Sequence, residues 1–287
     1  MHIDLNMKLL RYGPKGQEKP GILDREGKIH DLSGIVPDIT GQVLSDDSLA
    51  QLRTLDLASL PVVNGEPRIG PCVGAVQKFI GIGLNYADHA AETGLAIPKE
   101  PVVFNKWVTC ISGPSDNIEI PAGSTKTDWE VELGVVMGRT ARRVSEAEAI
   151  TYVAGYCVVN DVSEREYQNE RGQTWDKGKG FDTFGPIGPW LVTRDEVPDP
   201  QTLDLWLETD SIRRQTGNTK TMIFSVAELV SYLSRIMTLS PGDVIATGTP
   251  PGVGMAQKPE PIFLRPGQTV RSGVEGLGEQ RQVTVQS

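Results

Sequence analysis

The sequence has 287 residues, with 37 acidic and 28 basic side chains that give a formal net charge of −9. This length suits one large domain, or a large domain with a small satellite, and 38% hydrophobic residues can build a substantial core. The acidic balance argues against nucleic acids and anionic membranes as partners. No hydrophobic run approaches the roughly 18 residues of a membrane span, and the N-terminus lacks a signal-peptide layout, so we expect a cytoplasmic protein.

The cysteines and the turn-forming residues narrow the fold class further. Cys72, Cys110 and Cys157 are unevenly spaced and form no C-x-x-C motif, so neither a disulfide framework nor a zinc site is indicated. The 31 glycines and 20 prolines fall between short β-rich runs. This pattern predicts many turns and a strand-dominated fold.

The first part of the chain predicts a small β-rich unit. Two short hydrophobic runs flank the turn signal Asp24–Gly27, which is typical of a hairpin. A helical stretch near residues 46–56 follows, and then a hydrophobic strand at 79–82. We therefore expect a satellite over residues 1–71 and a main domain over residues 72–287.

Two helices of the main domain have capping-box signatures, at Ser145–Glu148 and at Ser225–Glu228. The second signature opens a hydrophobic stripe at helical spacing, which predicts a helix that faces the core: Val226, Leu229, Val230, Leu233, Ile236 and Met237. A strand at 243–247 then enters the glycine-rich turn 248–252, and the rest of the chain alternates like hairpins.

Paired carboxylates mark the strand that begins near Asp128. Alternate side chains of a strand point to the same face, so Glu130 and Glu132 project together. A second hydrophobic run ends in another carboxylate, Asp161. These oxygens would suit Mg²⁺ or Mn²⁺. The residues leave open a second interpretation, in which Glu130 lies on the surface and Glu132 pairs with an arginine or lysine.

His89 is the histidine with the most suggestive neighbours. If Asn85 caps a short helix, His89 and Glu92 lie on one face, where the carboxylate can fix the imidazole tautomer and raise its basicity. A general base needs this arrangement. A solvated histidine with an ordinary ion pair remains the alternative at this point, and His2 and His30 receive no role.

Several basic and amide side chains are candidates for binding an anionic ligand. Lys106 follows a hydrophobic strand, and Lys179 lies between two glycines that would let the backbone approach a ligand closely. Arg165 and Gln168, three residues apart, could point along one helix face toward the same pocket. Most lysines lie on the protein surface and bind no ligand, so this alternative stays open for both Lys106 and Lys179.

Taken together, short motifs in this order and spacing resemble the fumarylacetoacetate hydrolase family over about residues 72–287. The motifs are Gly81–Tyr86 with His89 and Glu92, then Trp129–Leu133, Asn160–Val162, Lys179–Asp182, Gly217–Phe224 and Gly248–Pro250. The resemblance implies an α/β, β-rich fold with a mixed, rolled β-sheet. It also implies that the N-terminal unit matches the small β satellite of longer bacterial members.

The resemblance implies roles for individual residues. Three carboxylates would bind Mg²⁺ or Mn²⁺, namely Glu130, Glu132 and Asp161. A water-activating dyad on a mobile lid would consist of His89 and Glu92, with Lys179 as the catalytic lysine of the pocket. The substrate would be contacted by Thr249, Lys106, Arg165 and Gln168.

The activity implied by the resemblance is metal-dependent hydrolysis of a C–C bond in a small-molecule 2,4-diketo acid, by a homodimer. The predicted substrate is 2,4-diketo-3-deoxy-L-rhamnonate or L-fuconate, cleaved to pyruvate and lactate. Alternatives within the family are a fumarylpyruvate or acylpyruvate hydrolase, an oxaloacetate decarboxylase and a ureidoglycolate lyase-like enzyme. An alternative of another class is a non-catalytic protein that binds a metal or a sugar acid.

Overall fold

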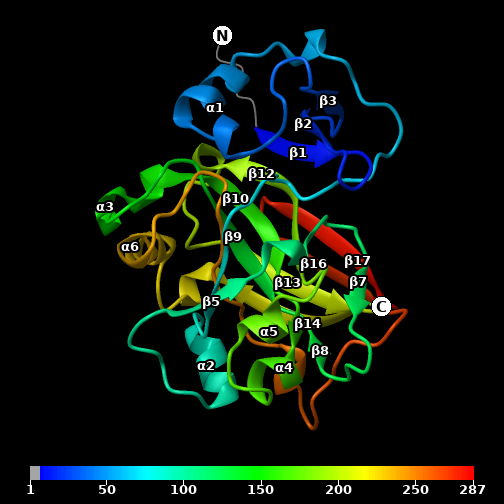
Figure 1. Ribbon diagram of the computed structural model, residues 1–287, viewed down its shortest axis with the longest axis vertical. Coiled ribbons are helices and arrows are strands. Elements are labelled where there is room, and N and C mark those ends of the chain that lie inside the picture. The colour runs from blue at the N-terminus through cyan, green and yellow to red at the C-terminus, as the bar shows by residue number, and fades with distance from the viewer. Residues whose placement is uncertain (1–6) are drawn as a thin grey trace.

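The computed structural model describes residues 7–287, which form two mixed sheets and a two-stranded antiparallel sheet, with short helices around them (Figure 1). The strands of the large sheet are β1 (Lys8–Tyr12), β2 (Lys19–Leu23), β3 (Ile29–Asp31), β4 (Phe79–Gly83), β5 (Val102–Lys106), β6 (Ile111–Ser112), β9 (Val131–Met137), β10 (Val153–Asn160), β12 (Gly185–Thr193) and β15 (Val244–Ala246). The second sheet consists of β7 (Ile118–Ile120), β13 (Asp204–Thr209), β14 (Ile212–Asn218), β16 (Thr269–Val274) and β17 (Gly278–Gln286), and β8 (Thr127–Asp128) pairs with β11 (Ser163–Glu164).

The helices are short and lie outside the sheets. They are α1 (Asp46–Arg53), α2 (Ala87–Thr93), α3 (Glu146–Ala149), α4 (Arg165–Asn169), α5 (Asp176–Lys179) and α6 (Val226–Ile236). Further 3-10 turns occur at Gly41–Val43, Leu57–Ser59, Val108–Cys110, Ile150–Tyr152, Arg194–Glu196, Thr219–Thr221 and Gly254–Ala256. The predicted α/β, strand-rich fold class is confirmed.

The large sheet mixes parallel and antiparallel pairs. Its strand order is β3-β2-β1-β12-β10-β9-β15-β4-β5, with β6 beside β12. The pairs β15–β4 and β12–β6 are parallel, whereas β9 is antiparallel to both β10 and β15. In the second sheet the order is β14-β13-β16-β17-β7.

The N-terminal unit continues the large sheet. The predicted hairpin is confirmed as β2–β3, and β1 pairs antiparallel with β12, so that Leu9 lies opposite Leu191. In Figure 1 this unit, with α1, lies at the top of the molecule above β12. The domain boundary at residue 72 stays a prediction, and backbone hydrogen bonds join the two parts within one sheet.

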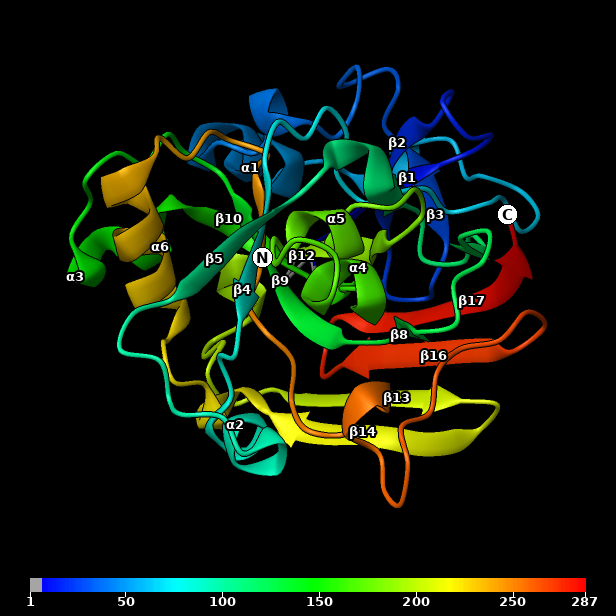
Figure 2. The same ribbon diagram turned by 60° about the horizontal axis from the view of Figure 1, so that its bottom comes forward.

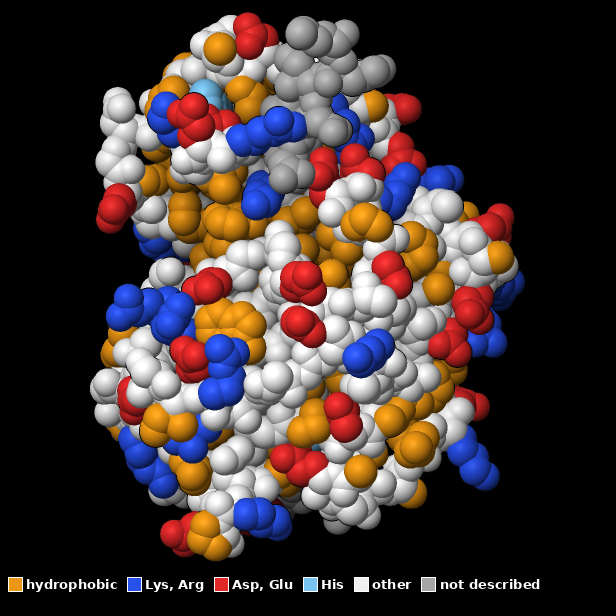
Figure 3. All heavy atoms as spheres, turned by 180° about the vertical axis from the view of Figure 1, so that it is seen from behind, with side chains coloured by type: hydrophobic (Ala, Val, Ile, Leu, Met, Phe, Trp, Pro, Cys, Tyr) orange, Lys and Arg blue, Asp and Glu red, His pale blue; other side chains and the backbone are white. Residues whose placement is uncertain are grey.

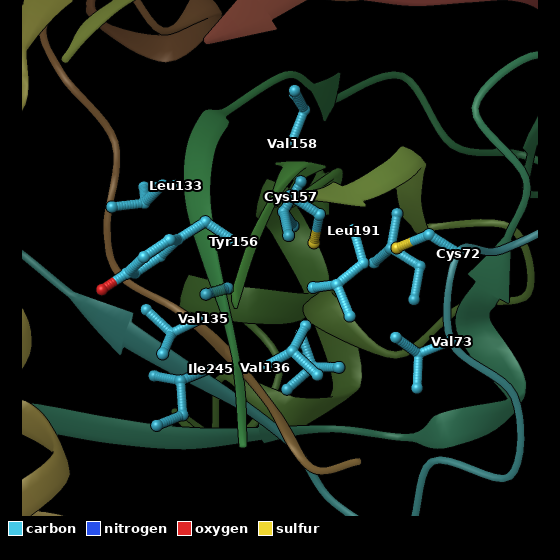
Figure 4. Close-up of a cluster of buried hydrophobic side chains, with 14 of the residues drawn as sticks. Cys72, Val73, Leu133, Val135, Val136, Tyr156, Cys157, Val158, Leu191 and Ile245 are labelled. Carbon is cyan, nitrogen blue, oxygen red and sulfur yellow. The ribbon is translucent and has the colours of Figure 1, made fainter. Parts of the chain in front are cut away.

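Two neighbouring strands at the centre of the large sheet are buried over their whole length. Every residue of β9 and of β10 is buried, which explains why these strands are almost continuously hydrophobic. Figure 4 shows their side chains packed with Leu191, and with Cys72 from the connection to the N-terminal unit. The hydrogen bond with the Cys157 thiol and burial raise the pKa of Cys72, and all three cysteines are buried and free.

One of the two predicted capping boxes forms. At the start of α6, Ser225 and Glu228 exchange side-chain and backbone hydrogen bonds, and the predicted stripe is buried from Val226 to Leu233. Ile236, at the edge of the stripe, is 58% exposed. Before α3, by contrast, the hydroxyl of Ser145 donates to the Glu148 side chain itself, so neither side chain caps the backbone.

The face of the molecule shown in Figure 3 has no large patch of a single charge sign. Acidic and basic side chains are interspersed there, and hydrophobic side chains gather below the N-terminal unit. Among the helices of residues 7–287, none combines the length and hydrophobicity of a membrane span.

Candidate active site and metal centre

A cavity of about 240 Å³ opens beside the start of β9, between α2, α4, α5 and the loop after β15. Figure 2 shows α4 and α5 over the middle of the molecule and α2 at its lower rim. Seven of the predicted site residues line this cavity: His89, Glu130, Glu132, Arg165, Gln168, Lys179 and Thr249. Residues from five separate segments therefore converge on one space.

The three predicted metal carboxylates lie together. One oxygen each of Glu130, Glu132 and Asp161 can be chosen so that all lie within 4.8 Å of one another, and all three residues are buried. The pairing of β9 with β10 brings them together, and the Asp161 N–H donates to the Glu130 carbonyl at 2.8 Å. Glu130 directly precedes β9 and still shares the face of Glu132. The alternative of a surface Glu130 does not hold.

Basic side chains contact two of these carboxylates. Lys179 Nζ lies 2.6 Å from Glu130 Oε2 and 2.6 Å from Asp161 Oδ2. Arg165 lies 2.7 Å from Glu130 Oε1. Burial alone would raise the pKa of Glu130, but the charges of Lys179 and Arg165 outweigh it and lower that pKa to about 2.

Glu132 differs from its neighbours, since no basic side chain among residues 7–287 forms an ion pair with it. Its Oε2 accepts a hydrogen bond from Gly248 N–H at 2.8 Å. Burial and the negative charges of Asp161 and Glu130 raise the pKa of Glu132 well above its usual range. Three oxygen donors with this local excess of negative charge fit a hard divalent cation such as Mg²⁺ or Mn²⁺.

Lys106 does not line the cavity as the resemblance implied. Its side chain is fully buried, and Nζ donates to Asp161 Oδ1 at 2.6 Å and to the Lys179 carbonyl. The pairing of β4 with β5 places Lys106 opposite Phe79 and turns its ammonium toward the back of the carboxylate cluster. It can therefore hold Asp161 in place without contacting a ligand in the cavity.

His89 and Glu92 lie on one face of α2, as predicted. His89 Nδ1 and Glu92 Oε2 are 3.0 Å apart. The imidazole is not a solvated surface group, because His89 is only 7% exposed, whereas Glu92 is exposed. Gly252 N–H donates to Glu92 Oε1 at 3.1 Å. With Nδ1–H donating to Glu92, a neutral imidazole keeps the lone pair of Nε2 for a ligand or water.

Asn85 is not the helix cap that the sequence predicted. Tyr86 precedes α2, and no side chain caps the helix there. The buried Asn85 side chain instead donates to the carbonyls of Phe224 and Thr247 at 3.0 and 2.8 Å, and accepts from Phe224 N–H at 2.8 Å. The segment Gly217–Phe224 thus anchors the base of α2.

Arg165 and Gln168 share one turn of α4, as their spacing predicted. Arg165 donates to Gln168 Oε1 at 2.9 Å, which leaves the Gln168 amide N–H groups to face the cavity. The glycine before Lys179 serves packing and not ligand access. A Cβ at Gly178 would lie 2.5 Å from the Glu164 carbonyl oxygen, so glycine lets α5 pack against the segment around Glu164 and α4.

Thr249 lies at the cavity wall with its hydroxyl already engaged. The hydroxyl donates to the Val131 carbonyl at 2.8 Å and accepts from Gln215 Nε2 at 2.8 Å. Gln215 also accepts from Val131 N–H at 3.0 Å, so this fully buried amide fixes the start of β9. The role of Thr249 as a substrate contact stays a prediction.

Sequence reasoning assigned no role to two residues that support the site. Gln215 follows no recognisable motif and lies 84 positions from Val131, so only the pairing of the sheets reveals it. Asp128 adjoins the Trp129–Leu133 motif, but only its burial, which the sequence does not show, identifies it as a residue that supports the site. It is fully buried and bonded to Arg165 Nε at 2.8 Å.

The comparison with known families agrees with this geometry. The family model described as fumarylacetoacetate (FAA) hydrolase, C-terminal, matches residues 78–286. The chain belongs to the fumarylacetoacetate hydrolase family. A Burkholderia ambifaria protein named as a hydrolase is 73% identical over 278 residues, covering 97% of this chain and 99% of that protein.

Solved structures of the family superpose on almost the whole chain. A 5-carboxymethyl-2-hydroxymuconate delta-isomerase from Mycobacterium smegmatis is 33% identical with a TM-score of 0.75, covering 98% of this chain and 99% of that one. A maleylpyruvate hydrolase from Sphingobium sp. SYK-6 is 28% identical with a TM-score of 0.81, covering 98% and 100%. The latter structure contains a manganese(II) ion and pyruvate.

Proposed function

We propose that this protein is a divalent-metal-dependent hydrolase that cleaves the C–C bond of a 2,4-diketo acid. The observation that carries the proposal is that the His89–Glu92 pair and the carboxylates Glu130 and Glu132 meet at one cavity. A base and a cation site on the same cavity are what hydrolysis of a chelating acid requires. The manganese and pyruvate in the maleylpyruvate hydrolase structure support the same reading.

The residues divide the chemistry between them. Glu130, Glu132 and Asp161 would hold the cation, which when bound supplies positive charge next to the oxygens of a 2-keto acid and favours its enolate form. His89 Nε2 takes a proton from a water that attacks the C4 carbonyl, and Glu92 holds the imidazole in the tautomer that can do so. The C3–C4 bond then breaks and leaves the electron pair on the pyruvate fragment as an enolate, and C3 takes up the proton that His89 received, which gives pyruvate.

Lys179 and Gln168 would stabilise the negative charge that develops in this step. Lys179 lines the cavity and carries a buried ammonium, and Gln168 directs amide N–H groups toward the same space. Donors fixed in advance in a water-poor site stabilise an oxyanion more than bulk water does.

The structure lends less physical support to a sugar-derived substrate than the resemblance implied. Arg165, Lys179 and Thr249, expected to bind a polar chain, all have partners within the protein. Much of the remaining wall is hydrophobic, namely Ile82, Leu84, Leu95, Phe104, Trp175 and Met255. The diketo-deoxy-rhamnonate or fuconate assignment stays a prediction beside fumarylpyruvate and other acylpyruvates.

Pyruvate release tests the proposal. The purified protein with Mg²⁺ or Mn²⁺ is given the sugar-derived diketo acid, fumarylpyruvate, a simple acylpyruvate and oxaloacetate, and kcat/KM is measured for each. We expect pyruvate from at least one 2,4-diketo acid. If kcat/KM for the sugar-derived acid is not at least about tenfold higher than for the other compounds, that acid is not the substrate. No pyruvate from any diketo acid would overturn the proposal.

The similarity to the delta-isomerase supports isomerisation as a second candidate. The same histidine could move a proton between two carbons without cleavage. Incubation in D₂O separates the two reactions, because an isomerase exchanges a substrate proton and shifts the ultraviolet spectrum while releasing no pyruvate.

A homodimer remains a prediction from the resemblance. Light scattering of the protein as it elutes from a size-exclusion column would test it.

A further inference from the structure

The loop after β15 contacts helix α2 on one side and a buried carboxylate on the other. On the first side, Gly252 N–H donates to Glu92 of α2 at 3.1 Å. On the second side, the N–H groups of Gly254 and Met255 donate to Asp128 Oδ1 and Oδ2 at 2.6 and 3.0 Å. One short loop therefore joins α2 to Asp128.

Asp128 continues this path to the carboxylate cluster. Its side chain is fully buried, and Oδ2 accepts from Arg165 Nε at 2.8 Å. The same guanidinium lies 2.7 Å from Glu130 Oε1. Because Arg165 is held between the two carboxylates, the position of Asp128 determines where the guanidinium meets Glu130.

The loop approaches Asp128 too closely to shift without consequence. A Cβ at Gly254 would lie 2.0 Å from the Ile262 carbonyl oxygen and 2.6 Å from Asp128 Oδ1, so only glycine fits there. Trp129 Nε1 also donates to the Gly252 carbonyl at 3.1 Å. A displacement of Gly252 is therefore passed to the amides that contact Asp128.

We propose that Asp128 is a positioning residue that couples the closed position of α2 to the position of Glu130. With α2 closed, Glu92 holds Gly252, the following amides hold Asp128, and Asp128 holds Arg165 against Glu130. The inference rests on the proposed cation site and on the mobile lid that the resemblance implies for α2, but it is independent of which acid is cleaved.

The test compares Asp128→Asn with a matched control, Asp243→Asn. Asp243 is equally buried, accepts from Lys78 N–H and Ser240 N–H at 3.0 and 2.6 Å, and pairs with Lys78 Nζ at 2.7 Å. Each variant keeps the side-chain size and puts an amide where a carboxylate met backbone donors. Only Asp128 leads to α2 and the carboxylate cluster.

Two measurements without substrate decide the matter, namely Mn²⁺ affinity by calorimetry and hydrogen exchange of the α2 amides. We expect Asp128→Asn to weaken Mn²⁺ binding by about tenfold or more, as loss of a residue that orients a metal ligand does, and to speed α2 exchange. The Asp243→Asn variant should leave both unchanged. Equal values in the two variants would reduce Asp128 to a structural residue.

A second pair of variants keeps the test decisive if Asp128→Asn does not fold. Met255→Pro removes the N–H that donates to Asp128, whereas Met255→Ala keeps it and removes only the side chain. Faster α2 exchange in the proline variant alone supports the coupling, and the same rate in both overturns it. If the wild type bound no Mn²⁺, the proposed function would fail, and the exchange rates would still decide the coupling.

Discussion

Lys179 Nζ lies 2.6 Å from Asp161 Oδ2, so the candidate catalytic lysine is also an ion-pair partner of a candidate metal ligand. The other oxygen of Asp161 accepts from Lys106 at 2.6 Å. One buried carboxylate is thus shared by two lysines, of which only Lys179 reaches the cavity. Loss of Lys179 should therefore affect the cavity directly, whereas loss of Lys106 should act only through Asp161.

The first prediction concerns the cation. Treatment with EDTA should abolish turnover, and Glu132→Gln or Asp161→Asn should weaken Mn²⁺ binding by more than about 100-fold, because a direct ligand matters more than a residue that orients it. Calorimetric titration measures the affinity, with Glu26→Gln, an exposed carboxylate, as the control. Full activity after exhaustive chelation would show that turnover does not require a divalent cation.

The second prediction separates the dyad from the cation site. His89→Ala should lower kcat by about 10²–10⁴-fold, the usual contribution of a general base, and Glu92→Gln should lower it less. Mn²⁺ affinity of the His89 variant should stay near the wild-type value, since the imidazole contacts Glu92 and not the carboxylate cluster. If the His89 variant lost the metal as well, His89 would be a ligand.

The third prediction concerns Lys106. Lys106→Met should lower the free energy of unfolding by about 3–5 kcal/mol, because Asp161 loses one of its two buried ammonium partners. Denaturant unfolding without added metal measures it. Lys126→Met, which breaks a largely exposed pair with Glu170, should lower the free energy of unfolding far less, because solvent screens that pair. Equal losses in the two variants would contradict the buried role of Lys106.

The fourth prediction is a pH dependence at the junction of the N-terminal unit with the rest of the molecule. Arg68 contacts Glu18 at 2.9 Å and Asp116 at 2.6 Å. Burial would raise the pKa of both carboxyls, but hydrogen bonds from Arg68 and from the backbone outweigh it and lower the pKa of each, with the charge of Arg11 acting on Glu18 and that of Arg68 on Asp116.

A carboxyl whose pKa is lower in the folded state stabilises the fold above its unfolded pKa, and this contribution is lost as the pH falls through the folded pKa. The Tm should therefore decrease as the pH drops below the ordinary carboxyl pKa values, which are 4.5 for Glu18 and 3.8 for Asp116. Arg68→Met should lower the Tm at neutral pH and make the acid-dependent fall shallower. An unchanged slope in that variant would remove Arg68 as its cause.

Local pattern predicted much of the fold and the centre of the site. The hairpin after β1, the buried α6 and the shared face of Glu130 and Glu132 each follow from spacing within a few residues. The His89–Glu92 pair needs only one turn of helix. Contacts of this kind are encoded where they occur, so a single sequence reveals them.

Contacts between distant segments were the ones that the sequence did not reveal. Asn85 bonds residues around positions 224 and 247 instead of capping its own helix. Lys106 points behind the cluster because of its register with β4, and Gln215 reaches β9 from another sheet. Each depends on how strands from different parts of the chain lie against one another, which periodicity does not report.

The antiparallel pairing of β1 with β12 has a consequence for any shortened form of the protein. A chain that begins at residue 78, where the family match starts, would lack β1 and leave the backbone N–H and C=O groups around Leu191 unpaired. Such an open edge is a template for pairing with another molecule. The N-terminal strands therefore cover the edge of β12 and should reduce aggregation, although they contribute no residue to the carboxylate cluster.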